Sequence, residues 1–171
     1  MLINNKSKKK SAVDLKAELL NCCGNEKWAD EMSGFVPFGS AEEIEETAEK
    51  IWNKLGKEDK LESFGHHPKI GDIESLKKKY SSSGELSKQE QSGIHTASEI
   101  TLKELAVYNE EYEKKFGYVF LVCATGKTAD EMLGIIKIRI LNDPETEFRI
   151  ACNELIKITK LRLNRITGKL L

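Results

Sequence analysis

Residues 117–126 of this chain have the sequence GYVFLVCATG. Its uninterrupted apolar run between two glycines is typical of a buried β-strand. No second stretch has a convincing strand pattern, and a lone strand would leave its backbone N–H and C=O groups unpaired. We therefore predict that residues 118–124 form a buried extended segment between helices. Its backbone groups need other partners, and a bound ligand is one candidate.

Helical patterns dominate the sequence on either side of this segment. Residues 41–55 carry apolar side chains at helical spacing, follow a capping box formed by Ser40 and Glu43, and stop at Gly56. The fold class predicted is all-α, as a single compact multi-helix domain over residues 1–171 that begins with a polar N-terminal segment, residues 1–10. The other predicted helices cover residues 12–22, 28–32, 59–64 and 87–116, a stretch that starts at 128, and 144–166.

The composition excludes several classes of protein. The 171 residues include 27 basic and 28 acidic side chains, for a formal net charge of -1. This balance argues against nucleic acid as a partner. The sequence has no apolar run of about 18 residues, so we expect no membrane-spanning helix. It also shows no secretory signal pattern at its start.

The four cysteines, Cys22, Cys23, Cys123 and Cys152, form no C-x-x-C pair. Adjacent cysteines rarely bridge each other, and this spacing does not suit a zinc site. We therefore expect reduced, mostly buried thiols. The chain ends in GKLL, which is not a peroxisomal signal, and a cytoplasmic protein is the expectation.

Polar side chains fall on the core face of one predicted helix. Ser87, Glu90 and Gln91 share a face with Ile94, at the N-terminal end of an apolar stripe. One interpretation is a plain capping box between Ser87 and Glu90. Another is a ligand site, because a helix N-terminus presents N–H groups that suit an anion. The two interpretations are compatible.

Arg162 lies on the apolar stripe of the last predicted helix, which includes Ala151, Leu155 and Ile158. A buried guanidinium needs an anionic partner. That partner is either an internal carboxylate, such as Glu90, or the carboxylate of a ligand held by paired hydrogen bonds. The alternative is a side chain whose stem packs on apolar surface while its charged end reaches water.

His67 is a candidate acid–base residue. Pro68 stiffens the turn that follows it, and Gly71 allows the backbone to bend beyond. An imidazole on a rigid loop suits proton transfer near neutral pH. His66 cannot face the same site from an extended dipeptide. The sequence has no H-x-x-x-H or H-E-x-x-H pattern, so no metal site is predicted. The alternative is an incidental loop histidine.

Several motifs together resemble one known family over nearly the whole chain. Each is weak alone, but their order and distances are specific. They resemble the 2-oxo-4-hydroxy-4-carboxy-5-ureidoimidazoline (OHCU) decarboxylase family. The motifs are His67-Pro-Lys-Ile-Gly71, Ser87-Lys-Gln-Glu-Gln-Ser-Gly93, Asn109-x-x-Tyr112-x-x-Lys115-Phe116-Gly117, Phe120-Leu-Val-Cys-Ala-Thr-Gly-Lys127, Asn142-Asp-Pro-Glu-Thr-Glu147 and Lys160-Leu-Arg-Leu163.

The resemblance implies an all-α carboxy-lyase that needs no cofactor and forms a homodimer. It assigns His67 as the catalytic acid–base residue and places Glu90 in a group that binds the substrate, and we expect Glu90 also to assist His67 in catalysis. The implied substrate-binding residues are Pro68, Ser87, Gln91, Arg162 and the backbone of Phe120, Leu121, Val122 and Cys123.

The implied reaction converts OHCU, a small-molecule substrate, to (S)-allantoin in urate degradation. The scissile carboxylate is attached to a ring carbon next to an imine, so the electrons left by CO₂ delocalise into the C=N bond. Because the substrate supplies its own electron sink, no pyridoxal or thiamine cofactor is required. Two rival functions remain open at this point, a non-catalytic helical interaction module and a metal-assisted ureide hydrolase.

Overall fold

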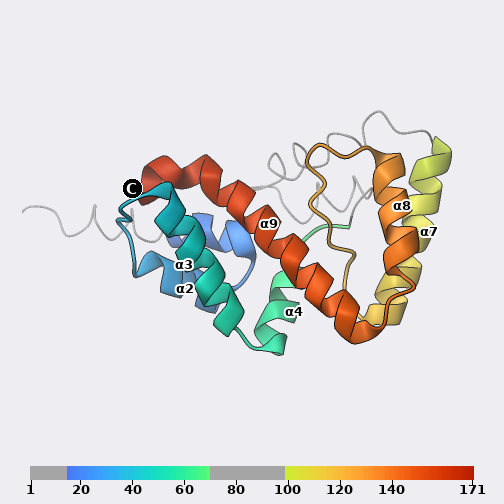
Figure 1. Cartoon of the computed structure of the whole chain (residues 1–171), viewed down its shortest axis with the longest axis horizontal. Coiled ribbons are helices and arrows are strands. Elements are labelled where there is room, and N and C mark those ends of the chain that lie inside the picture. The colour runs from blue at the N-terminus through green and yellow to red at the C-terminus, as the bar shows by residue number, and fades with distance from the viewer. Residues whose placement is uncertain (1–14, 70–98) are drawn as a thin grey trace, which may run out of the picture. The chain divides into compact units, whose positions relative to one another are not determined.

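The computed structural model describes residues 15–69 and 99–171. Within these ranges the chain is helical and contains no β-strand, which confirms the predicted all-α fold class. The first helix covers residues 15–23 of the described chain. The others are α2 (Glu26–Ser33), α3 (Ala41–Lys54), α4 (Lys57–Gly65), α7 (Glu99–Phe116), α8 (Ala129–Arg139) and α9 (Pro144–Leu170) (Figure 1).

The chain divides into two compact units. Unit 1 comprises Met1–Ser63 and Ile156–Leu171, and unit 2 comprises Phe64–Leu155. The chain passes from one unit to the other within α4 and again within α9. The single domain expected over residues 1–171 stays a prediction.

Unit 1 is built around the apolar stripe predicted for α3. Its side chains Ile44, Ala48, Ile51 and Trp52 are buried. α2 lies beside α3 (Figure 1), and Trp28 of α2 donates from its indole N–H to the Ala48 carbonyl at 3.0 Å. This bond satisfies the one polar group of a fully buried indole.

The cap of α3 differs in one detail from the prediction. The Ser40 hydroxyl accepts the backbone N–H of Glu43 at 3.1 Å, as a capping residue should. The Glu43 carboxylate, however, accepts the N–H of Gly39 at 2.7 Å instead of that of Ser40. The predicted reciprocal bond of the capping box is therefore shifted by one residue.

The predicted starts of α8 and α9 are confirmed. Thr128 and Glu131 form a complete capping box at α8, and the Asp143 carboxylate accepts two N–H groups of the first turn of α9. The predicted end of the last helix, residue 166, is wrong because α9 continues to Leu170. Leu170 is fully buried and its carbonyl accepts the N–H of Phe38 at 2.9 Å. Tertiary contact thus extends the helix beyond its local signal.

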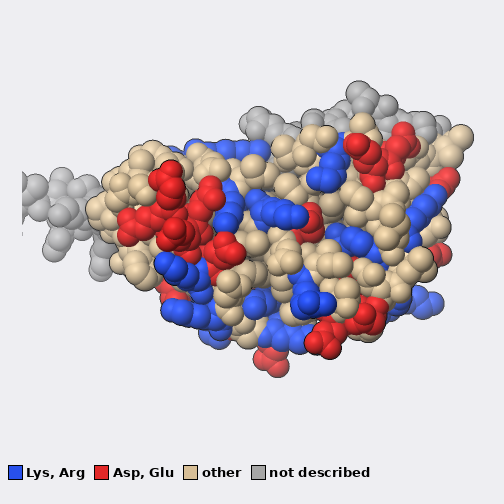
Figure 2. All heavy atoms as spheres, viewed as in Figure 1, with Lys and Arg blue, Asp and Glu red and all other residues tan. Residues whose placement is uncertain are grey.

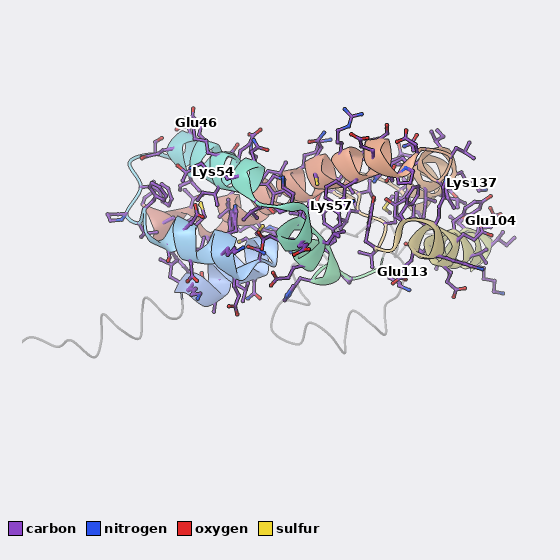
Figure 3. The ribbon with its side chains drawn as sticks, turned by 90° about the horizontal axis from the view of Figure 1, so that it is seen from below. Glu46, Lys54, Lys57, Glu104, Glu113 and Lys137 are labelled. Carbon is purple, nitrogen blue, oxygen red and sulfur yellow. The ribbon has the colours of Figure 1, made fainter. Side chains whose placement is uncertain are left out.

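Unit 2 contains α7 and α8 side by side (Figure 1). Lys137 of α8 pairs with Glu104 of α7 at 2.6 Å, and both are labelled in Figure 3. The Thr101 hydroxyl adds a second link between these helices by donating to Asp130 at 2.7 Å. The core between them is apolar and includes Leu105, Tyr112, Phe120, Val122, Met132 and Ile136.

The surface charge is uneven. Figure 2 shows acidic side chains gathered over α3. Lys160 of α9 pairs with Glu49 of this group at 2.7 Å and with Glu45 at 4.0 Å. In the described ranges, no helix is both long and apolar enough to cross a membrane.

Candidate active site

The apolar segment predicted at residues 118–124 lies between α7 and α8 in the chain, without helical or strand structure, and four of its seven residues are buried, whereas Tyr118, Val119 and Cys123 are partly exposed. The side chains of Phe120, Leu121 and Val122 are at most 5% exposed. Glycines with positive φ stand at its two ends, Gly117 at 81° and Gly126 at 78°. The Lys127 N–H donates to the Ala124 carbonyl at 3.0 Å. Such a turn with positive φ at its third residue favours glycine there.

Backbone groups of this segment bond to side chains, as a buried chain without a strand partner requires. The Leu121 carbonyl accepts Nη1 of Arg139 at 2.7 Å. The Cys123 N–H donates to Oε2 of Glu154 at 2.7 Å. The Cys123 carbonyl accepts Nζ of Lys127 at 2.8 Å. Charged side chains therefore fix the segment on residues 121 and 123.

Arg139 and Glu147 form a buried ion pair beside the segment. Arg139 is 6% exposed and Glu147 is fully buried. Nε and Nη2 of the guanidinium both donate to Oε1 of Glu147, at 2.9 and 2.5 Å. The Tyr112 hydroxyl also donates to Oε1 of Glu147, and the Asn142 amide donates to Oε2 at 2.8 Å. The pair is thus both neutralised and hydrogen-bonded, which a buried charge requires.

Tyr112 keeps its proton in this cluster. Burial, and next its hydrogen bond to Glu147, raise the pKa of the Tyr112 hydroxyl well above its ordinary value. Its ring stands edge-on to that of Phe120, with centroids 5.2 Å apart. Tyr112 therefore donates a hydrogen bond to the ion pair through its hydroxyl and packs against the apolar segment through its ring.

His67 is buried, at 4% exposure, whereas His66 is exposed. Only one of the two adjacent histidines is therefore buried, and that His67 faces a site stays a prediction. Its backbone N–H donates to the Phe64 carbonyl at 3.1 Å, and the following Pro68 is buried. The backbone at His67 is thus bonded to the end of α4, and its imidazole is shielded from water.

The chain is anchored on both sides of His67. On one side, the Phe64 ring packs 5.1 Å from that of Tyr118 and 5.6 Å from that of Phe148, measured between centroids. On the other side, Lys69 forms an ion pair with Glu113 of α7. Since Tyr118 begins the apolar segment, one of these anchors joins the histidine loop to it.

Arg162 is buried in unit 1, at 7% exposure. This rules out the alternative of a charged end that reaches water. Nη1 donates to the Asn21 carbonyl at 3.0 Å, while the Thr159 hydroxyl donates to the next carbonyl, that of Cys22, at 3.3 Å. These carbonyls belong to the last turn of helix 15–23, where a cation is favoured.

The model of the OHCU decarboxylase family matches residues 8–164 of this chain. The chain belongs to this family. It is 39% identical over 146 residues to the uric acid degradation bifunctional protein TTL of Arabidopsis thaliana, a match that covers 85% of this chain and 45% of that protein. It is 25% identical over 127 residues to the OHCU decarboxylase of Haloferax volcanii, covering 74% of this chain and 73% of that protein.

A solved structure of a family member has the same fold. A crystal structure of OHCU decarboxylase in the presence of (S)-allantoin matches with a TM-score of 0.75 and 37% identity, over 88% of this chain and 97% of that one. The chain spans less than half the length of the bifunctional relatives that it matches. The predicted relationship to the OHCU decarboxylase family is confirmed.

The sequence-predicted site of this OHCU decarboxylase family member is only partly within the described residues. His67, Pro68 and Phe120–Cys123 belong to unit 2, and Arg162 belongs to unit 1. Ser87, Glu90 and Gln91 lie outside the described residues. The helix predicted to start at Ser87 is described from Glu99 onward. In the part of the chain that is described, no group of three or more His, Cys, Asp or Glu side chains is placed to hold a metal ion.

Sequence reasoning assigned no role to Arg139, Glu147 or Glu154, although Glu147 ends a motif shared with the OHCU decarboxylase family. A signal for Arg139 was present. The buried residues of α8 are Ala129, Met132, Leu133, Ile136 and Arg139, so Arg139 lies on the apolar stripe. A place on an apolar stripe predicts burial for Arg139 just as it does for Arg162. Glu154 had no such signal, because its partner Cys123 is distant in the sequence and belongs to no helix.

Proposed function

We propose that this protein is a carboxy-lyase that converts OHCU to (S)-allantoin and CO₂ without a cofactor, with His67 as its acid–base residue. The observation that carries the proposal is the burial of His67 next to an exposed His66, on a loop anchored at both ends to unit 2. A desolvated imidazole suits proton transfer to a reacting carbon. Membership of the OHCU decarboxylase family supports the choice of substrate.

The reaction requires the protein only to orient the substrate and to deliver a proton to it. The bond between the ring carbon and the carboxylate breaks, CO₂ leaves, and the electron pair delocalises into the adjacent C=N bond. The hydroxyl on the carbon that lost CO₂ then gives up its proton and becomes a carbonyl, and a proton adds to the neighbouring former imine carbon, which carries the ureido group. If His67 protonates that carbon from one face only, the product is a single enantiomer, and we propose the S form. Glu90 assists the imidazole in this proposal.

The proposed substrate-binding groups include some that the structure describes and others that lie outside the described residues. Phe120, Leu121 and Val122 are buried, and the backbone of Phe120–Cys123 is the proposed partner for the amides of a ureide ring. Arg162 is a buried cation that suits the substrate carboxylate. Pro68, Ser87 and Gln91 complete the proposed set. Homodimer formation and a cytoplasmic location are also part of the proposal, and sedimentation of the purified protein tests the first.

The test of the proposed function measures whether the protein releases CO₂ from OHCU. OHCU is unstable, so it is generated in situ from urate, and CO₂ release is measured with and without the protein. We expect release well above the spontaneous rate, unaffected by a metal chelator. Loss of OHCU without CO₂, abolished by the chelator, would favour a metal-assisted hydrolase. No effect on OHCU would favour a non-catalytic interaction module.

A further inference from the structure

We infer that Arg139 is a positioning residue for the substrate-binding segment, acting through the Leu121 carbonyl and the Phe120 ring. The inference rests on the proposed function, because it assumes that the segment binds substrate. Arg139 itself is not assigned any contact with the substrate. It is the last residue of α8, donates to the Leu121 carbonyl and lies over the Phe120 ring.

The guanidinium is held by all of its nitrogen atoms and by its face. Nη1 reaches the Leu121 carbonyl at 2.7 Å, whereas Nε and Nη2 are held by Glu147. Its Cζ lies 4.7 Å from the centroid of the Phe120 ring. Because the guanidinium is planar, the bonds from Nε and Nη2 to Glu147 also set the direction in which Nη1 points. Glu147 thus aims Arg139 at the segment.

Glu147 is in turn fixed from two further sides. The Tyr112 hydroxyl of α7 donates to one oxygen of its carboxylate, and the Asn142 amide donates to the other. Together they join α7, the end of α8 and the start of α9 in a single cluster. A buried ion pair contributes little net stability compared with a packed apolar pair. The cluster instead holds the Arg139 guanidinium in the orientation that reaches the Leu121 carbonyl.

The spacing of the bonded backbone groups indicates which edge of the segment contacts the protein. Leu121 is held by Arg139, and Cys123 is held by Glu154 and Lys127. In an extended chain, backbone groups of alternate residues point to the same edge. Residues 121 and 123 therefore use one edge for protein contacts. By the same alternation, the N–H and C=O of Val122 are expected at the opposite edge, which we assign to the ring of a ureide.

The experiment compares Arg139→Lys with Lys137→Met. Lysine keeps a positive charge beside Glu147 but lacks the planar fork that also reaches Leu121. Lys137→Met changes the same helix and breaks an ion pair with Glu104 that does not touch the segment. For each protein we measure amide hydrogen exchange of a peptide covering residues 118–126, and KM and kcat for OHCU decarboxylation.

We expect Arg139→Lys to speed exchange in this peptide and to raise KM about tenfold, the effect of losing one charge-assisted hydrogen bond. Lys137→Met should change neither. Loss of global stability alone lowers the active fraction, and hence kcat, but does not raise KM. If Arg139→Lys does not fold, Tyr112→Phe removes only one donor to Glu147 and should move both quantities in the same direction by a smaller factor.

Faster exchange with an unchanged KM would overturn the inference, as would unchanged exchange in a folded Arg139→Lys protein. Failure of the proposed function has a different signature, namely a wild-type protein that does not release CO₂ from OHCU. In that case the exchange measurement still decides whether Arg139 orders the segment.

Discussion

The Glu154 carboxylate, on α9, accepts the backbone N–H of Cys123 at 2.7 Å. Cys123 was predicted from the sequence to bind substrate through its backbone. In the structure its N–H is bonded to Glu154 and its carbonyl to Lys127. Cys123 therefore contributes to the proposed site by fixing the segment, and a substrate that used its N–H would have to displace a carboxylate.

This relationship predicts the behaviour of Glu154 variants. Glu154→Ala removes the acceptor, so the segment loses one of its fixed points and KM for OHCU should rise several-fold. Stability should fall by about 1 kcal/mol, the net value of one hydrogen bond. Glu154→Gln keeps an acceptor oxygen and should remain close to wild type. A lower KM in Glu154→Ala would instead show that Glu154 competes with the substrate.

The two adjacent histidines provide a matched pair of variants. His67→Ala removes the buried imidazole and should reduce kcat by about 10²-fold or more, the usual contribution of a positioned acid–base group. His66→Ala removes an exposed imidazole one residue away and should have no measurable effect on kcat. Circular dichroism spectra confirm that both variants fold. Near-normal turnover by a folded His67→Ala protein would remove His67 from the mechanism.

Arg162 has an observed bond to a backbone carbonyl and a proposed bond to the substrate, and a second matched pair of variants can separate the two. Arg162→Ala should raise KM about tenfold or more, because a buried cation no longer meets the substrate carboxylate. It should also destabilise the protein, since it loses the bond to the Asn21 carbonyl. Thr159→Val removes the neighbouring bond to the Cys22 carbonyl and should cost only stability, about 1 kcal/mol. Equal KM values for the two variants would reduce Arg162 to a helix-capping role.

The burial of Cys23 predicts how stability responds to alkaline pH. Burial, opposed by hydrogen bonds from Ser63 and Thr159, raises the pKa of this thiol from 9.0 to about 12. The unfolded state therefore releases the proton first. Stability is fully present below pH 9.0 and decreases as pH rises toward about 12, by at most about 1.4 kcal/mol per pH unit from this one group.

Urea unfolding midpoints between about pH 8 and 10 test this prediction. Over that window Cys23→Ala should lose less stability with rising pH than the wild type does. The window ends near 10 because Tyr118, whose pKa burial raises to about 12, begins to contribute above the ordinary tyrosine pKa. Identical slopes for Cys23→Ala and wild type would mean that the thiol is not desolvated in solution.

Much of the fold was readable from local patterns. The stripe of α3 and the caps of α8 and α9 depend on residues within a few positions of one another, so short-range spacing is sufficient to find them. The apolar segment was identified by a missing partner strand, and its backbone does bond to side chains. The burial of Arg162 followed from its place on an apolar stripe.

The rest depends on contacts between residues that are far apart in sequence. Cys123 and Glu154 are separated by 31 positions, and no periodicity connects a non-helical backbone N–H to a helical carboxylate. The end of α9 depends on the burial of Leu170 and on its bond to Phe38, which only the tertiary structure reveals. Arg139 is different, because its place on the α8 stripe was visible and was not used.

The most direct test of the central claim is the optical activity of the product. OHCU is generated from urate in situ, and the circular dichroism of the allantoin is followed with wild-type protein and without protein. A desolvated imidazole that protonates one face should yield one enantiomer, the S form, faster than the spontaneous reaction. Slow formation of racemic allantoin, indistinguishable from the protein-free control, would contradict the account.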